Sequence, residues 1–187
     1  EHDLIRKPVS TFRDHALKRR KRLAAVRRYL WEQAMKFEIP PSLKAEHEEL
    51  HGELVRATKA GGRTGEAAKA VAKLMHPHFI KEEEYALPPL GLLTALSRGQ
   101  IESGMAEVTK MTDRLEAELP QMLAEHKDIV AALETLVEAA AAESKSDQAH
   151  FAEELMAHAR MEEEVSYPTA LLIGRYLKTV LPGASGR

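Results

Sequence analysis

The chain has 187 residues, of which 44% are hydrophobic and 30% are charged, values that are ordinary for a single soluble domain. It contains no cysteine, which excludes disulfides, iron–sulfur clusters, zinc fingers and a thiol nucleophile. The net charge is −2, and no run approaches the roughly 18 apolar residues of a membrane span or has the apolar region of a secretory leader. We therefore expect a cytoplasmic protein without membrane association.

The first 40 residues form a basic segment, with 11 Lys and Arg against 5 acidic residues. Within it, residues 11–37 have the apolar spacing of a helix. The run LKRRKRL at 17–23 raises the possibility of nucleic-acid binding, but such runs are more often the solvated face of a helix. We expect a basic N-terminal helical extension over 1–40 that does not bind nucleic acid.

Two helices are expected next. The first follows Pro41 and carries an apolar stripe beside His47, and Gly61 and Gly62 end it. The second begins near Thr64. Pro77 interrupts that pattern, which predicts either a kink or a new helical start just before His78.

Proline and glycine then mark a crossover at 88–99, after which residues 101–142 read as a long helical segment that Pro120 bends or divides. A final helix is expected over about 148–179, with a kink at Pro168.

No segment alternates in the manner of a strand, so the fold class predicted is all-α. The four helices of residues 41–180 are expected to form one bundle, preceded by the extension 1–40 and followed by a tail, 181–187.

A histidine-and-acid pattern occurs twice in this predicted bundle. The sequence AEH at 45–47 is followed by HFIKEEEYALP at 78–88, and AEH at 124–126 is followed by HARMEEEVSYP at 158–168. The separations are 31 residues from His47 to His78 and 32 from His126 to His158. This repeat indicates two similar halves of one site.

The spacing explains the chemistry of the pattern. Residues four apart share a helix face, so His78 with Glu82, and His158 with Glu162, each present an imidazole and a carboxylate together. If these helices pack side by side, the two pairs meet the single histidines of the AEH motifs. Imidazole with carboxylate suits iron, and also zinc or manganese, and shared carboxylates would offset the repulsion between two nearby cations.

The order of these motifs resembles the hemerythrin-like, or HHE cation-binding, domain family over about residues 43–170. The resemblance implies an up-down-up-down four-helix bundle, here with an additional N-terminal helix, around two iron ions in a bridged non-haem di-iron centre. The positions that match the family's ligands are His47, His78, Glu82, His126, His158 and Glu162.

The match to the oxygen-carrying members is incomplete. Those members have H-x-x-x-H on the third bundle helix and H-x-x-x-x-D on the fourth, whereas here Val130 follows His126 by four residues. Glu162 comes one position early, although Glu163 supplies an acid at the later spacing. His51, four residues after His47, either restores a fifth imidazole ligand or packs beside the centre.

The resemblance therefore implies binding or redox processing of a small oxidant, dioxygen or peroxide, more than reversible oxygen carriage. The alternative is a metal-stabilised regulatory or interaction module, or an iron sensor without turnover. The sequence determines neither catalytic turnover nor the oligomeric state.

The remaining polar residues near the motifs are expected to serve other roles. Tyr85 is expected on the inward face, either beside the metals or as a core tyrosine with a satisfied hydroxyl, and Tyr167 is expected off that face. One histidine and three glutamates close to the motifs are expected at the surface: His76, Glu83, Glu84 and Glu164.

Overall fold

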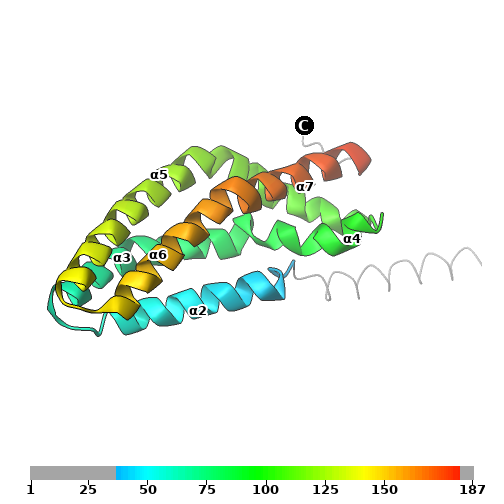
Figure 1. Cartoon of the computed structure of the whole chain (residues 1–187). Helices are drawn as coiled ribbons and strands as arrows, with labels where there is room; N and C mark the ends of the chain where they lie inside the picture. The colour runs from blue at the N-terminus through cyan, green and yellow to red at the C-terminus, as the bar shows by residue number, and fades with distance from the viewer. Residues whose placement is uncertain (1–36, 182–187) are drawn as a thin grey trace, which may run out of the picture. The chain divides into compact units, whose positions relative to one another are not determined.

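The computed structural model describes residues 37–181, and every regular element in that part of the chain is helical (Figure 1). Its long helices are α2 (Pro41–Ala57), α3 (Gly62–Lys81), α5 (Ala106–Ala142), α6 (Ser146–Met161) and α7 (Tyr167–Val180). A crossover lies between α3 and α5 and contains a 3₁₀ turn (Pro88–Leu92), the short α4 (Leu93–Ser97) and a second 3₁₀ turn (Ser103–Met105).

Four of these helices close on one another as a bundle. The helix α2 packs against α3 and α6, and α5 packs against the same two helices, while α7 continues the line of α6 and also lies on α5 (Figure 1). The predicted all-α packing of four helices is therefore confirmed. The expected N-terminal helix, and all but the first residue of the expected C-terminal tail, lie outside the described residues. Within the described residues, no helix is both long and apolar enough to span a membrane.

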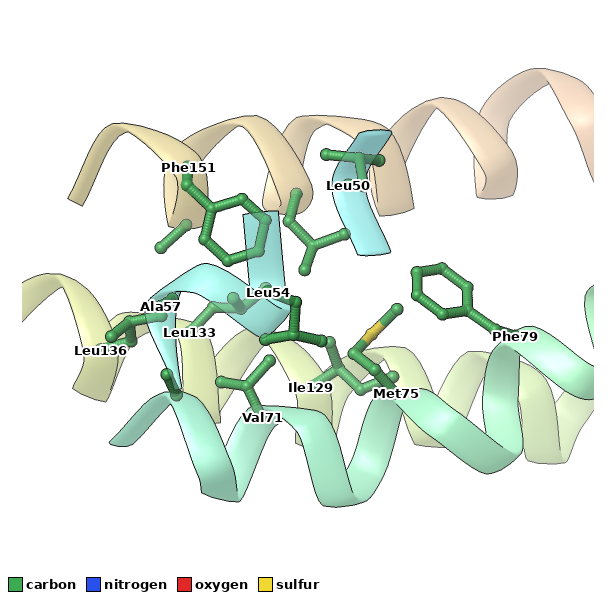
Figure 2. Close-up of a cluster of buried hydrophobic side chains, with 13 residues drawn as sticks. Leu50, Leu54, Ala57, Val71, Met75, Phe79, Ile129, Leu133, Leu136 and Phe151 are labelled. Atoms are coloured by element: carbon green, nitrogen blue, oxygen red, sulfur yellow. The ribbon is translucent and has the colours of Figure 1, made fainter. Parts of the chain in front are cut away.

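The apolar core occupies the part of the bundle next to the α2–α3 and α5–α6 turns. Leucine, valine, isoleucine and phenylalanine side chains from all four helices meet there (Figure 2). On α5 the buried residues Ile129, Leu133 and Leu136 follow the helical spacing of one face. Complete burial of such a side chain contributes about 1.5–3 kcal/mol. The core ends at Phe79, whose ring centroid lies 5.0 Å from that of His47.

Glu143 joins the two turns at this end of the bundle. Its carboxylate accepts hydrogen bonds from the backbone N–H of Arg63 (2.7 Å) and from the backbone N–H (3.2 Å) and hydroxyl (2.7 Å) of Thr64. These are donors of the first turn of α3, which no residue of α3 itself can satisfy. Lys145 donates to Glu143 and to the carbonyls of Ala60 and Gly61. A residue on α5 thus caps α3.

Both helices that carry an H-x-x-x-E motif change into a π-helical turn at the glutamate. The turns are Glu82–Ala86 and Glu162–Ser166, and a proline follows each of these glutamates by six positions. A proline ring collides with the carbonyl four residues earlier in an α-helix and lacks an N–H. The wider π turn accommodates both defects, and such turns are frequent at functional sites.

Of the alternatives predicted at the prolines, a new helical start at Pro77 and a division of the helix at Pro120 are wrong. Pro77 neither restarts nor ends α3, and Pro120 does not divide α5, because each lies inside a continuous helix. A single proline removes only one ladder hydrogen bond, and tertiary packing holds the rest of the helix. In the last helical segment the interruption begins at Glu162, before Pro168.

Replacing Glu143 by glutamine should lower the melting temperature at neutral pH. The hydrogen bonds from Lys145, Thr64 and Arg63 hold the pKa of Glu143 at about 2, below its ordinary value of 4.5. A carboxyl group with a depressed folded-state pKa stabilises the fold above its unfolded pKa and loses that contribution as the pH falls toward the folded value. Thermal unfolding should therefore show a gap between wild type and Glu143→Gln that narrows below about pH 4.5.

Glu138→Gln is the matched control, because Glu138 is exposed on the same helix. A gap for Glu143→Gln that stays constant with pH, or that equals the control, would contradict the capping role.

Candidate metal centre

Two groups of three buried side chains lie near the end of the apolar core. One contains His47, His158 and Glu162, and the other contains His78, Glu82 and His126. In each group one nitrogen or oxygen atom per residue lies within 4.8 Å of the others. Each triad therefore has the donor atoms and the proximity to hold a metal ion.

The first triad is compact. The Nε2 atoms of His47 and His158 lie 3.3 and 3.2 Å from Oε1 of Glu162, and 3.2 Å from each other. The two imidazoles come from α2 and α6, and the carboxylate comes from the first residue of the π turn after α6.

The second triad repeats this arrangement, and one carboxylate reaches both. Oε1 of Glu82 lies 3.1 Å from Nε2 of His78 and 3.8 Å from Nε2 of His126. The other oxygen of Glu162, Oε2, lies 3.7 Å from Nε2 of His126. Because its two oxygens face different triads, Glu162 is placed to bridge two cations.

A layer of carboxylates outside the triads holds the imidazole rings. Three of the four Nδ1 atoms donate to a glutamate of a neighbouring helical segment: His78 to Glu125 (2.9 Å), His126 to Glu163 (2.9 Å) and His158 to Glu46 (3.0 Å). An Nδ1–H that donates to a carboxylate turns Nε2 toward the centre and makes it more basic, as around many metal-bound histidines.

Two buried polar atoms of the site have no hydrogen-bond partner: Nδ1 of His47 and Oε2 of Glu82. Leaving a buried polar atom unsatisfied costs about 1–3 kcal/mol. A cation in the second triad would provide a partner for Oε2 of Glu82. The residues present thus fit a metal ion.

The buried carboxylates favour protonated imidazoles at two positions of this site. Burial lowers the pKa of His158, but its hydrogen bond to Glu162 and the charges of Glu162 and Glu46 outweigh burial and raise that pKa to about 9. The pKa of His78 is raised in the same way by Glu82 and Glu125. Burial opposes ionisation of Glu82, yet hydrogen bonds from His126 and His78 hold its pKa well below the ordinary value. Metal binding would therefore displace protons.

Tyr167 lies inside the second triad, and the expectation that it lies off the inward face is wrong. Its hydroxyl donates to Oε1 of Glu82 at 2.6 Å and lies 3.3 Å from Nε2 of His126 and 3.5 Å from Nε2 of His78. A π turn closes on the fifth residue, and Tyr167 is the fifth residue after Glu162. The π turn therefore returns Tyr167 to the inward face, where α-helical spacing would not put it.

Tyr85 is a core tyrosine with a satisfied hydroxyl, the second of its two expected roles. The hydroxyl donates to Glu118 at 2.9 Å and approaches Sδ of Met122 at 3.4 Å. The guanidinium of Arg114 covers its ring at 4.2 Å. Tyr85 is thus bonded on the α5 side, away from the triads.

The structure brings together six of the seven residues expected as ligands. The seventh, His51, is exposed, and its ring packs edge-on against Phe79 with centroids 6.3 Å apart. It faces the same side of α2 as His47 but lies one turn farther along the helix, beyond the centre. Glu84 pairs with Arg114 at the surface, as expected.

Three glutamates outside the triads, Glu46, Glu125 and Glu163, hold imidazole rings, a role that was not anticipated although the repeat contains a signal for it. Glu46 and Glu125 precede the histidines of the AEH motifs, and Glu83 and Glu163 follow the first glutamate of each EEE run. The histidines beside these glutamates follow the same repeat: each glutamate of one half has a counterpart in the other half that lies beside the equivalent histidine. Glu83, expected to point away, lies 4.0 Å from Nδ1 of His47 and occupies the place that Glu163 holds beside His126.

The two halves differ at a buried position that lies five residues after the inner glutamate. Tyr167 follows Glu162 by five residues, and the residue five after Glu82 is Leu87, which is also buried. One triad therefore has a phenol beside it, and the other half has an aliphatic side chain at the equivalent position.

No known protein family, curated protein or solved structure matches the chain. The assignment of the site therefore depends on its own residues and their geometry.

Replacing Glu163 by glutamine should weaken metal binding about 10- to 100-fold, the usual effect of removing a partner of a metal-bound histidine. The amide can orient His126 but cannot supply the negative charge that makes Nε2 more basic. Competition with a chelator for Co²⁺ would measure the loss. Glu164→Gln is the matched control, since Glu164 is adjacent and exposed. Equal affinities in the two variants would remove Glu163 from the site.

Proposed function

We propose that this chain is a hemerythrin-like protein whose two buried triads hold two iron ions, and that it binds or redox-processes dioxygen or peroxide. The observation that carries the proposal is Glu162, whose two oxygens face different triads at 3.2–3.3 Å and 3.7 Å. A carboxylate placed in this way can hold two cations in register.

The donor set favours iron. Four imidazole nitrogens and two carboxylates suit iron, manganese or zinc, and a bridged pair of ions with several open positions is typical of reactive sites. Structural zinc sites, by contrast, are closed by four protein ligands. Each triad here contributes three residues, so a small ligand has room to bind.

The chain's own residues have distinct roles in this proposal. Glu82 and Glu162 neutralise and space the two cations, while the glutamates bonded to Nδ1 hold the rings. The apolar core next to the site excludes bulk water on that side. Iron in such a set supplies electrons to dioxygen or peroxide.

Tyr167 makes the two metal positions unequal. Its oxygen lies 3.5 and 3.3 Å from the Nε2 atoms of His78 and His126, within the range of 3.1–3.8 Å that separates those nitrogens from Oε1 of Glu82. We infer that the phenol is the fourth donor of that triad. Burial and the charges of Glu82 and Glu162 raise the pKa of Tyr167 in the metal-free chain, and a cation would offset these effects.

Elemental analysis of the chain, purified without added metal or chelator, tests the proposal. We expect about two irons per chain, and near none for His78→Ala or His158→Ala, because each variant removes an imidazole from a triad and the two triads share the carboxylate of Glu162. The control is His150→Ala: His150 and Glu154 form an H-x-x-x-E pair at 3.2 Å on the exposed face of α6. That variant should keep its iron.

Zinc in place of iron, with no change in absorption on adding oxidant or reductant, would favour the metal-stabilised regulatory module instead. Unchanged iron in the His78 and His158 variants would overturn the assignment of the centre. Circular dichroism separates loss of metal from loss of fold.

Replacing Tyr167 by phenylalanine should remove a visible absorption band while leaving the iron content near two. A phenolate bound to ferric iron absorbs visible light, whereas imidazole and carboxylate ligands alone do not produce that band. Resonance Raman spectra of the ferric protein would show phenolate ring modes in wild type only. The presence of these modes in Tyr167→Phe, or their absence from both proteins, would contradict the fourth-donor role; Tyr85→Phe should retain them.

A further inference from the structure

The four imidazoles of the centre are not held equally. Three of them donate from Nδ1 to a carboxylate at 2.9–3.0 Å. Nδ1 of His47 has no partner, although its side chain is only 4% exposed. The nearest carboxylate, that of Glu83, lies 4.0 Å away and is 57% exposed. His47 is therefore the ring that can rotate without breaking an outer hydrogen bond.

A groove of about 210 Å³, the α2–α3 groove, lies on the outer side of this ring between the two helices. Its polar lining consists of His47, Glu48, His51, His76 and Glu83. Imidazole and carboxylate groups thus extend from the surface to a ligand of the buried centre.

The other half of the molecule contains a matching groove that lacks this chemistry. The groove lies between α5 and α6 outside His126 and has a volume of about 340 Å³. Seven of its nine lining residues follow those of the first groove by 79 or 80 positions, and the other two are Ala131 and Glu134. The replacements are Lys127 for Glu48, Val130 for His51, Met156 for His76 and Arg160 for Ile80. Glu163 is bonded to His126 there. Lys127 and Arg160 oppose the entry of a cation there, although the carboxylate of Glu134 also lines the groove. The groove contains no imidazole besides that of His126.

The polar residues of the α2–α3 groove form a series along the helices. His76 and Glu83 are seven residues apart, which corresponds to about 10 Å along the helix. Phe79 lies between His76 and Glu83 in sequence. Its ring packs against His51 of α2 and also against His47. Among the described residues, only the two buried triads have three ligand atoms already within 4.8 Å. The groove therefore offers successive positions, not one closed site.

We propose that this groove is the route by which a divalent transition-metal ion reaches the buried centre. The inference rests on the proposed function. His51 and His76, both exposed, capture the ion from solvent, since imidazole binds such ions far better than water-exposed carboxylates alone. Glu83 receives it at the inner end. The His47 ring, which has no hydrogen bond at Nδ1, then rotates and carries the ion to Glu162.

A third groove, between α2 and α6, is an alternative route by which an ion could reach the centre. It has a volume of about 440 Å³ and contains Glu46, Glu49, Glu53 and Glu154 beside His158. Its carboxylates attract cations, but Glu46 is already bonded to His158 and holds that ring in place. This groove offers no mobile imidazole.

The rate at which the metal-free full chain takes up Co²⁺ tests the route. Uptake is monitored by visible absorption in a stopped-flow instrument. The double variant His51→Gln and His76→Gln should take up Co²⁺ about tenfold more slowly at limiting metal, because it loses the capture groups. Its final content, by elemental analysis, should equal that of wild type. Lys127→Gln in the matching groove, and the pair Glu49→Gln and Glu53→Gln in the competing groove, should leave the rate near wild type.

An unchanged rate in the histidine double variant, or a larger loss in the Glu49 and Glu53 variant, would overturn the route. A reduced final content in the double variant would also overturn it, by making His51 or His76 part of the centre. Absence of Co²⁺ binding to wild type would instead refute the metal centre itself. Glu83→Gln supplies a second test. Uptake of Co²⁺ into the centre should slow, while His51 and His76 should still capture an ion at the surface.

Discussion

The structure depends on burying four imidazoles and two carboxylates in one small volume. Buried ionisable groups are tolerated only when they are paired, since each unpaired charge costs several kcal/mol to desolvate. Here the pairing is arranged in two layers. Glu82 and Glu162 face the Nε2 atoms from inside, and three outer glutamates accept from Nδ1. The repeated AEH and EEE motifs supply both layers from the same short segments.

The π turns connect this electrostatic requirement to the backbone. Each begins at the inner glutamate and ends just before the residue that precedes the proline. In the second half the extra residue per turn brings Tyr167 inward, and in the first half the same geometry buries Leu87. The prolines disfavour a regular α-helix at these positions, and the π turn accommodates the missing N–H and the proline ring.

Much of the site could be predicted from local spacing, because an H-x-x-x-E pair needs only a helix to share a face. The grouping of His47 with His158 and of His78 with His126 requires the packing of separate helices, which the repeat indicated only in outline. Tyr167 was misplaced because α-helical periodicity fails across a π turn. Glu46 and Glu125 were missed since they lie beside the ligand face, and only the packed bundle shows that each meets a histidine of a neighbouring helix.

The differences between the two halves are more informative than their similarity. A symmetric pair of triads would satisfy the electrostatic requirement equally well, so Tyr167 opposite Leu87, and an imidazole-lined groove opposite one that contains Lys127 and Arg160, need a separate explanation. The two asymmetries fall on different triads: the phenol lies beside His78, Glu82 and His126, and the open groove leads to His47. One triad has the phenol hydroxyl beside its imidazoles, while the other contains the imidazole whose Nδ1 has no hydrogen-bond partner. If both triads hold a cation, one half would thus be suited to retaining it and the other half to exchanging it.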